Sequence, residues 1–270
     1  MSIRLTALHI YPLKSCAALA PTQIEVETRG LAHDRRWMIV DAGRRFITGR
    51  EQPRLVLIRA EPTPRGLLLR APGLPDLLVA PPRASAERIE VTVWRSLVDA
   101  ALASDEAHTW VSRFLRADCK LVYMDASAAR PVDPEYAQPG DEVSFADAYP
   151  LLLISQGSLA ALNAKLHQPV SMLRFRPNLV IDGVPAHAED GWKRMRVGKI
   201  EFELLKPCVR CGFTTVIPET GALDPRGEPL RTLANYRRGV KGVQGVIFGM
   251  NVIARGRGRM TVGDTVEVLS

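Results

Sequence analysis

The chain has 270 residues, of which 46% are hydrophobic and 24% are charged, an ordinary globular composition with ample material for a core. This length suits one large domain or two small ones packed together. No apolar run approaches the ~20 residues that span a bilayer, and the first residues do not form a signal peptide. The four cysteines are unevenly spaced and do not predict a disulfide framework. We therefore expect a soluble cytoplasmic protein with no membrane partner.

The net charge of +7 is compatible with a nucleic acid, an acidic protein or a phosphorylated ligand as partner. Between Arg226 and Arg259 there are eight basic residues and one acidic residue, Glu228. This stretch is either a solvated face or a docking surface for an acidic partner, and the sequence leaves both open. Aromatic residues make up only 6% of the chain and do not alternate with basic ones, so no specific nucleic-acid binding is expected.

The first part of the chain is predicted to consist mainly of short strands separated by proline and glycine. A hairpin is expected over residues 36–48, with its turn at Gly43. An amphipathic helix is expected after Ser104, its N-cap, because apolar residues recur there at helical spacing. Further strands are expected at residues 55–58, 67–69, 89–93 and 119–124.

A change of composition marks the middle of the chain. Residues 125–147 are polar and rich in proline, which makes them the best candidate for a domain boundary. We accordingly expect one domain over residues 1–125 and a second over residues 126–270.

The second part is predicted to combine strands with two short helices. One helix follows Ser155, its cap, and runs to about residue 166, and the other covers residues 230–237. Strands are expected at residues 150–154 and 178–181 and within 245–269, where a hairpin turn is expected at 262–264. The pattern predicts a β-rich α+β fold, barrel-like, with a few helices.

The most informative segment is residues 206–215, in which two thiols flank an arginine. It follows residues 200–205, which alternate like a strand that runs into a loop. A thiolate is a soft metal ligand, and the neighbouring guanidinium of Arg210 lowers the cost of keeping it ionised. Cys208 and Cys211 are therefore candidates for a metal ligand or a reactive thiol.

Three other interpretations of Cys208 and Cys211 remain open. A zinc site needs four ligands and usually a second pair, but Cys16 and Cys119 are isolated. A thioredoxin-like redox pair would open a helix, which the preceding Pro207 and the following threonines do not favour. Two small buried residues at the end of a strand would simply be inert.

Four further segments bring cationic or hydroxyl side chains into turns and could form an anion site beside Cys211. They are residues 11–16, 30–37, 155–159 and 174–178. Each also has a simpler explanation. Ser155 can be only a helix cap, Arg35 or Arg36 can pair with Asp34 on the surface, and residues 14–15 can be an ordinary turn.

Taken in order, these motifs resemble one family over nearly the whole chain. They are Tyr-Pro-x-Lys-Ser-Cys at 11–16, Gly-Leu-x-x-Asp-Arg-x-Trp at 30–37, Arg-Glu-x-Pro-Arg-Leu-Val-Leu-Ile at 50–58, Ser-x-x-Ser-Leu at 155–159, Phe-Arg-Pro-Asn at 175–178 and the cysteine motif. The chain is similar to the MOSC proteins that carry an N-terminal MOSC β-barrel domain. That family includes the mitochondrial amidoxime reducing components and the YcbX-type proteins.

The resemblance implies an N-terminal MOSC β-barrel-like domain packed on a MOSC-type β-barrel domain, with a molybdenum cofactor, Mo-molybdopterin, between them. It implies that Cys211 is the molybdenum ligand and the catalytic residue. The residues that bind the cofactor by the same resemblance are Lys14, Ser15 and Arg35 from the first domain, and Ser155, Ser158, Arg176, Asn178, Arg210 and Thr214 from the second.

The implied activity is the two-electron reduction of N-hydroxylated compounds (hydroxylamines, amidoximes and N-hydroxylated base analogues), a detoxification reaction. The chain has no cluster-binding cysteine spacing and no nucleotide fingerprint, so we expect its electrons to come from a separate, acidic ferredoxin- or flavodoxin-type protein. The alternative is a molybdenum cofactor carrier or sulfur-transfer protein in which Cys211 carries a persulfide, because MOSC domains also occur in cofactor sulfurases.

Overall fold

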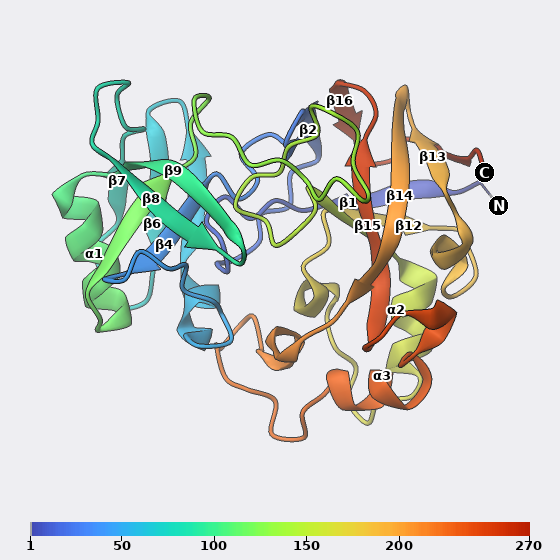
Figure 1. Cartoon of the computed structure of the whole chain (residues 1–270). Helices are drawn as coiled ribbons and strands as arrows, with labels where there is room; N and C mark the ends of the chain where they lie inside the picture. The colour runs from blue at the N-terminus through green and yellow to red at the C-terminus, as the bar shows by residue number, and fades with distance from the viewer. Residues whose placement is uncertain (1) are drawn as a thin grey trace.

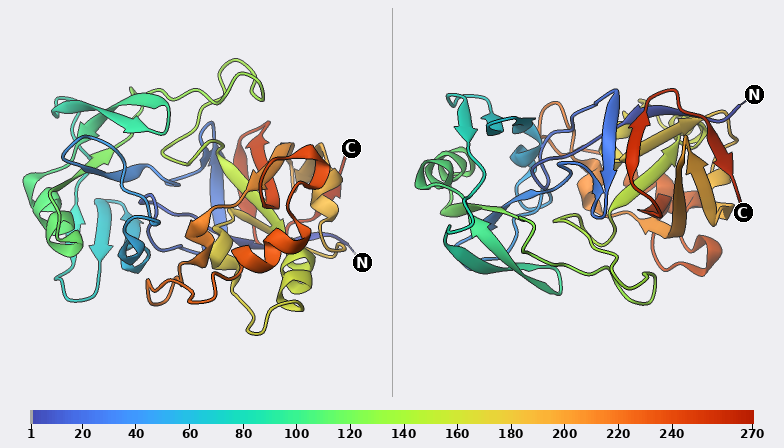
Figure 2. Two further views of the ribbon diagram at one scale, coloured as in Figure 1. Left: turned by 60° about the horizontal axis from the view of Figure 1, so that its bottom comes forward. Right: turned by 90° about the horizontal axis from the view of Figure 1, so that it is seen from above.

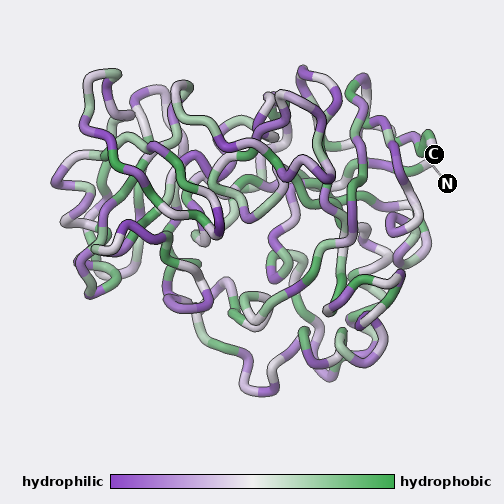
Figure 3. The backbone as a smooth tube through the Cα atoms, in the orientation of Figure 1, coloured by the Kyte–Doolittle hydropathy of each residue, from purple (hydrophilic) through white to green (hydrophobic). Residues whose placement is uncertain are grey.

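The computed structural model describes residues 2–270, which form two halves that lie side by side (Figure 1). The first half, blue to green, carries helix α1 (Asp105–Leu115), and the second, mainly yellow to red, carries helices α2 (Gln156–Asn163) and α3 (Leu230–Tyr236). Hydrophobic segments occur throughout both halves (Figure 3), and each half buries a core of its own. The predicted β-rich fold with a few helices is confirmed.

The second half is built on a nearly closed barrel of seven strands. Their order is β1 (Arg4–Leu8), β12 (Leu179–Asp182), β11 (Leu151–Ser155), β15 (Ile247–Ala254), β14 (Ile200–Val209), β13 (Arg194–Val197) and β17 (Val266–Val268). The two edge strands approach each other at a bridge between Arg4 and Thr265, and Val266 N donates a hydrogen bond of 2.9 Å to Ile3 O. Closure of this kind leaves little of the sheet edge exposed.

Strand β11 illustrates how the sequence produces the barrel and its cover. Because side chains alternate along a strand, Leu151 and Leu153 enter the core inside the barrel. Leu152 and Ile154 point the other way and pack in a second core with residues of α2 and α3. Figure 2 shows these two helices together on one side of the barrel. A strand buried on both faces therefore has a continuous apolar sequence.

The first half combines two smaller sheets with one helix. The four-stranded sheet has the order β4 (Trp37–Asp41), β10 (Cys119–Tyr123), β9 (Ser96–Leu102) and β8 (Arg88–Val93), and the three-stranded sheet has the order β5 (Arg59–Thr63), β6 (Gly66–Arg70) and β7 (Leu77–Val79). Helix α1 begins at Ser104, whose Oγ accepts a hydrogen bond of 3.3 Å from Ala107 N. The predicted N-cap is thus confirmed, and the helix buries Trp110 and Phe114 against the sheet.

Strands from the start of the chain belong to the second half. Strand β1 pairs with β12, and β2 (Gln23–Glu27) pairs with both β3 (Gly30–Leu31) and β16 (Gly258–Thr261). The division of the chain at residue 125 stays a prediction, and the sheets do not follow it over the first 31 residues. Such pairing between the two ends of a chain leaves no local trace in the sequence.

Two predicted strands of the first half are wrong. Residues 55–57 instead lie in a 3-10 helix, η1 (Pro53–Leu57), because Pro53 fits the first turn of a helix, where its missing N–H is not needed. Leu55 and Val56 are nevertheless buried, as their apolar character requires. Residues 44–48 form two isolated bridges, Val40 with Phe46 and Arg45 with Thr92, rather than the second strand of a hairpin.

The second half differs from prediction at two places. Strand β14 does not end at residue 205 but continues through Cys208 to Val209, with two irregularities in its pairing with β15. The turn at residues 262–264 joins strands of different sheets, since β16 pairs with β2 and β17 pairs with β13, so no hairpin forms. The remaining short 3-10 helices are η2 (Met172–Phe175), η3 (Ala188–Gly191), η4 (Gly212–Thr215) and η5 (Val240–Gly242).

The expected helices of the second half are present. Ser155 caps α2 through a hydrogen bond from Ser158 N of 3.1 Å, although the helix ends at Asn163, earlier than expected. Helix α3 covers nearly the predicted residues. Among residues 2–270, none of the helices has the length and apolar character needed to cross a membrane.

Candidate cofactor site between the two halves

A cavity of about 150 Å³ lies where the two halves meet. Eight of the ten predicted site residues line it: Lys14, Ser15, Arg35, Arg176, Asn178, Arg210, Cys211 and Thr214. Its lining also includes Arg50 and Arg174, so that six basic side chains face it together with one acidic residue, Asp147. An excess of cations around a partly enclosed space is the expected environment of an anionic ligand.

Cys211 lies at the point where β14 gives way to η4. It occupies the N-cap position of that turn, and its side chain is exposed. Thr214 holds the backbone of this turn, because its N–H and its hydroxyl both donate to Cys211 O, at 3.1 and 3.0 Å. Within residues 2–270 no hydrogen bond reaches the Cys211 sulfur. The thiol is thus fixed in place by its backbone and left available to a ligand.

Gly49 of the first half packs closely against Phe213 of this turn. A Cβ atom at Gly49 would lie 2.2 Å from the ring of Phe213, so only glycine allows the two segments to approach so closely. Arg174 supports the turn from the other side, since its Nη1 donates to Thr215 O at 2.8 Å and to Thr214 O at 3.3 Å. Burial lowers the pKa of Arg174. Arg174 lies in one of the predicted anion-site segments, residues 174–178, but no sequence motif indicated that it supports the cysteine turn.

Cys208 has different surroundings from Cys211. It is half-buried, and its sulfur accepts a hydrogen bond of 2.9 Å from Arg210 Nη1. Arg210 Nη2 donates to Phe175 O at 2.7 Å. Arg210, which was expected to stabilise the thiolate of Cys211, therefore contacts the sulfur of Cys208 instead.

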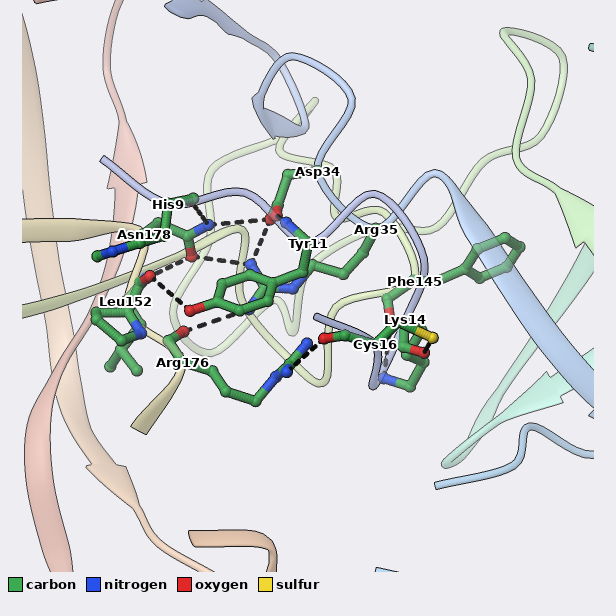
Figure 4. A network of polar contacts seen from close by, with 11 residues as sticks. His9, Tyr11, Lys14, Cys16, Asp34, Arg35, Phe145, Leu152, Arg176 and Asn178 are labelled. Carbon is green, nitrogen blue, oxygen red and sulfur yellow. Dashed lines mark hydrogen bonds and ion pairs between the residues drawn. The ribbon is translucent and has the colours of Figure 1, made fainter. Parts of the chain in front are cut away.

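Arg35 and Arg176 of the lining pack against the ring of Tyr11 (Figure 4). The guanidinium groups of Arg35 and Arg176 lie 4.4 and 4.0 Å from the ring centre of Tyr11. Burial lowers the pKa of Arg176 to about 10, so it stays charged at neutral pH, and burial raises the pKa of Tyr11 to about 12. Arg176 Nη1 donates to Cys16 O at 2.8 Å.

Two buried donors of this lining have no partner among the described residues. They are Arg176 Nη2 and Arg210 Nε. A buried donor on a cationic group without a partner is costly, and an anion in the cavity would remove that cost. Together with the other cations of the lining, these two guanidinium groups favour a negatively charged ligand in the cavity.

Asn178 lines the cavity, but its amide is already fully engaged. Its Oδ1 accepts from Arg35 Nη1 at 2.9 Å and from Leu152 N at 3.2 Å, and its Nδ2 donates to His9 O and Asp34 Oδ2, both at 3.1 Å. These bonds, drawn in Figure 4, join the segment before β12 to the loop that carries Asp34. Asn178 therefore positions Arg35 and is not free to bind a ligand itself.

Lys14 is buried at the rim of the cavity. Its Nζ donates to Phe145 O at 2.7 Å and pairs with Asp147 Oδ1 at 2.6 Å. Burial lowers the pKa of Lys14, an effect that the charge of Asp147 opposes. Desolvation acts to raise the pKa of Asp147, but the charge and hydrogen bond of Lys14 prevail and hold it below its usual range. Ser15, next to Lys14, is buried with a positive φ of 66°.

Ser155 and Ser158 do not reach the cavity. Both are fully buried, and both hydroxyls donate to the carboxylate of Glu189, at 2.9 and 2.7 Å. Ser155 N donates to the same carboxylate at 3.0 Å. The structure thus favours the simpler explanation of these serines, since Ser155 caps α2 and both hydroxyls bind a buried carboxylate; their cofactor role stays a prediction.

The basic stretch between Arg226 and Arg259 is largely paired within the protein. Arg237 is buried against Asp190, and Arg255 binds both Asp141 and Glu203, each at 2.7 Å. Glu203 lies six residues before the end of β14, which places Arg255 on the order of 20 Å along the strand from the Cys211 turn. Arg237 and Arg255 are therefore not available to a docking partner, whereas Arg226, Arg231 and Arg238 are exposed.

The described residues hold no group of three or more His, Cys, Asp and Glu side chains that could bind a metal ion. A zinc site of the kind considered from the Cys-x-x-Cys spacing is therefore not supported here. A metal at Cys211 would have to receive its other ligands from a molecule bound in the cavity.

Two family descriptions match this chain. The MOSC N-terminal beta barrel domain matches residues 2–118, and the MOSC domain matches residues 140–267. The mitochondrial amidoxime-reducing component 1 of Mus musculus is 35% identical, over 97% of this chain and 81% of that protein. The mitochondrial amidoxime reducing component 2 of Bos taurus is 32% identical, over 96% of this chain and 81% of that protein.

The predicted cytoplasmic location is wrong on these comparisons, because relatives that match nearly the whole chain are named as mitochondrial. That prediction relied on the first residues and on the absence of a disulfide pattern. Neither feature distinguishes the cytoplasm from other reducing compartments.

The cavity, the cysteine turn and the two matched domains lead to one assignment. The chain belongs to the family of MOSC proteins with an N-terminal MOSC beta barrel domain, together with the amidoxime-reducing components.

Proposed function

We propose that this chain is a molybdenum-cofactor-dependent reductase of N-hydroxylated compounds such as amidoximes and hydroxylamines. The observation that carries the proposal is the exposed Cys211 thiol in the same cavity as the unpaired guanidinium donors of Arg176 and Arg210. The names of the relatives support the choice of substrate, since they describe amidoxime reduction.

The chemistry of the cavity fits a molybdopterin. Molybdenum binds well to a soft thiolate, which Cys211 can supply without breaking an existing hydrogen bond. The phosphate of a pterin needs charge-assisted donors, which Arg176 and Arg210 offer, with Arg35 held beside them by Asn178. Ser15 and Lys14 would contribute at the rim, and Thr214 would hold the turn of the metal ligand.

The overall reaction converts an N–OH group into N–H and water and consumes two electrons and two protons. When bound, the molybdenum cofactor supplies the two-electron chemistry at the N–O bond. The chain itself binds the cofactor through its cations, orients the Cys211 thiolate and surrounds the reacting group with a partly enclosed, positively charged wall. Such preorganised charge acts more strongly in an enclosed site than in water.

We further propose that a separate redox protein supplies the electrons. An iron–sulfur cluster needs four thiolates at one place. Cys16 and Cys119 are buried in the core of the first half, so that only Cys208 and Cys211 share a location. A ferredoxin- or flavodoxin-type donor remains the expected partner, without assignment to the basic stretch near Arg255.

The test is to measure molybdenum, pterin and activity on the same purified protein. We expect about one molybdenum per chain, fluorescent pterin after oxidation, and reduction of benzamidoxime to benzamidine with dithionite as the reductant. Cyanide-releasable sulfur without molybdenum would indicate the sulfur-transfer alternative. Protein that holds molybdopterin but reduces no N-hydroxylated compound would indicate a cofactor carrier and contradict the proposal.

A further inference from the structure

A tryptophan in an unusual backbone conformation stands at the mouth of the cavity. Trp94 lies in the tight turn between β8 and β9 and has a φ of 55°, in the left-handed region that glycine favours. It lines the cavity, yet 43% of its surface is exposed. A large aromatic residue that persists in a strained turn and faces a ligand cavity suggests a functional role.

Neighbours on three sides fix the indole ring. Trp94 Nε1 donates to Asp147 Oδ1 at 3.2 Å, and Asp147 is in turn held by Lys14. The ring of Phe46 lies 5.0 Å from that of Trp94, and the guanidinium of Arg50 lies 5.0 Å from the Trp94 ring centre. The side chain is thus oriented before any ligand arrives, which reduces the entropy that binding would cost.

The cavity lining combines two kinds of side chain. Arg176 and Arg210 are cationic and suit an anion. Phe46 and Trp94, both from the first half, add aromatic rings to the cavity that Cys211 lines from the second half. The partly exposed indole of Trp94 offers an aromatic surface that suits a flat, conjugated molecule.

We infer that Trp94, with Phe46 and Arg50, forms a substrate wall that binds the flat ring of aromatic N-hydroxylated compounds. The inference rests on the proposed function and names the substrates of that same cavity. Aryl amidoximes and N-hydroxylated bases are bound by stacking on this wall, whereas small aliphatic amidoximes are not. Trp94 is a specificity-determining residue, and it takes no part in the chemical step.

The test compares benzamidoxime with acetamidoxime as substrates, with dithionite as reductant, in the wild-type holoenzyme and in Trp94→Ala. We expect the KM for benzamidoxime to rise about three- to tenfold in the variant, the range that an aromatic pair supports, with kcat unchanged. The KM for acetamidoxime should not change. Calorimetric binding of benzamidoxime to the oxidised enzyme should weaken by the same factor.

Two further variants separate the wall from a structural role. Trp94→Phe keeps an aromatic ring but loses the hydrogen bond to Asp147, and it should retain most of the preference for benzamidoxime. Leu97→Ala removes another exposed apolar side chain of the same hairpin, 62% exposed and outside the cavity lining, and should change neither KM.

Equal changes of KM for both substrates in Trp94→Ala would overturn the inference, and so would no change for either. A loss of rate with a protein electron donor but not with dithionite would also overturn it and identify Trp94 as a docking residue. Because wild-type reduction of acetamidoxime is measured in the same series, failure of the inference remains distinguishable from failure of the proposed function.

Discussion

Cys208 and Cys211 are three residues apart but occupy different environments. Cys208 lies within β14, half-buried, with Arg210 on its sulfur, whereas Cys211 lies after the strand with its sulfur exposed to the cavity. A ligand that replaces solvent at Cys211 breaks no protein contact, whereas a metal at Cys208 would have to displace a charge-assisted hydrogen bond. The two cysteines should therefore respond differently to the same substitution.

Cys211→Ser should lose molybdenum, or keep the cofactor with at least a hundredfold lower activity on benzamidoxime, because a hydroxyl is a harder and less ionised ligand. Cys208→Ser is the matched control and should keep molybdenum and most of the activity. Metal content and initial rates of both purified variants give the comparison. Equal losses in the two variants would point to a shared role of the thiols, as in a redox pair.

Arg176→Ala should release the cofactor during purification. Loss of a charge-assisted pair with a phosphate costs about 1.5–3 kcal/mol, or roughly 10- to 150-fold in affinity. Arg54→Ala serves as control, since Arg54 also lies over an aromatic ring, that of Phe114 at 4.8 Å, but is not part of the cavity lining. Pterin content after gel filtration measures retention. Normal content in Arg176→Ala would show that its unpaired donor does not bind the cofactor.

At the scale of single elements, helix α2 illustrates how one local motif can serve two different roles. The spacing of Ser155 and Ser158 suits a phosphate at a helix start, yet both hydroxyls bind Glu189, which is fully buried. Glu189 lies 31 residues beyond Ser158, so the contact leaves no pattern that a short window of sequence contains.

Ser158→Ala should therefore reduce stability and not cofactor retention. The substitution removes one of the donors to the buried carboxylate of Glu189, which costs about 1–3 kcal/mol in the free energy of unfolding. Denaturant titration measures the stability, and molybdenum content measures retention in the protein that remains folded. A stable variant that has lost its cofactor would restore the phosphate role that the structure does not support.

Elements governed by neighbouring residues were predictable, and those governed by distant pairing were not. Ser104 and Ser155 reveal the starts of α1 and α2 because a cap acts within three residues. The place of β1 in the barrel depends on β12, more than 170 residues away. Leu55, Val56 and Ile58 are buried as their apolar character predicts, but the helical turn that begins at Pro53 was not predicted.

At the scale of the whole molecule, the cavity exists because two halves close on one turn. Gly49 of the first half packs closely against the ring of Phe213, which follows Cys211 by two residues. Gly49→Ala should push the Phe213 ring aside, because the added methyl would lie 2.2 Å from it. We expect a loss of about 1–3 kcal/mol in stability, typical of overpacking, together with weaker retention of the cofactor.

The control for this variant is Gly191→Ala, since a Cβ atom at Gly191 meets nothing within 4 Å. Combining Gly49→Ala with Phe213→Ala should recover part of the lost stability, because the clash then has no partner. If Gly49→Ala alone is as stable as wild type and keeps its cofactor, the contact between the halves does not shape the site.

The location of the candidate site was largely predictable through its motifs. Eight of ten predicted residues line one cavity, although they come from segments up to 200 residues apart. The motifs could not predict which role each of these residues has. Asn178 proves to be saturated by hydrogen bonds, and Trp94 and Asp147 enter the cavity from a hairpin turn and a loop without any motif.

The claim that the Cys211 thiolate holds molybdenum in this cavity is tested most directly by X-ray absorption at the molybdenum edge. Wild-type protein and Cys208→Ser should show the same number of sulfur atoms bound to the metal. In any Cys211→Ser protein that keeps its molybdenum, that number should fall by one, with an oxygen in its place. An unchanged sulfur count in Cys211→Ser, or a loss of one sulfur in Cys208→Ser alone, would contradict the claim.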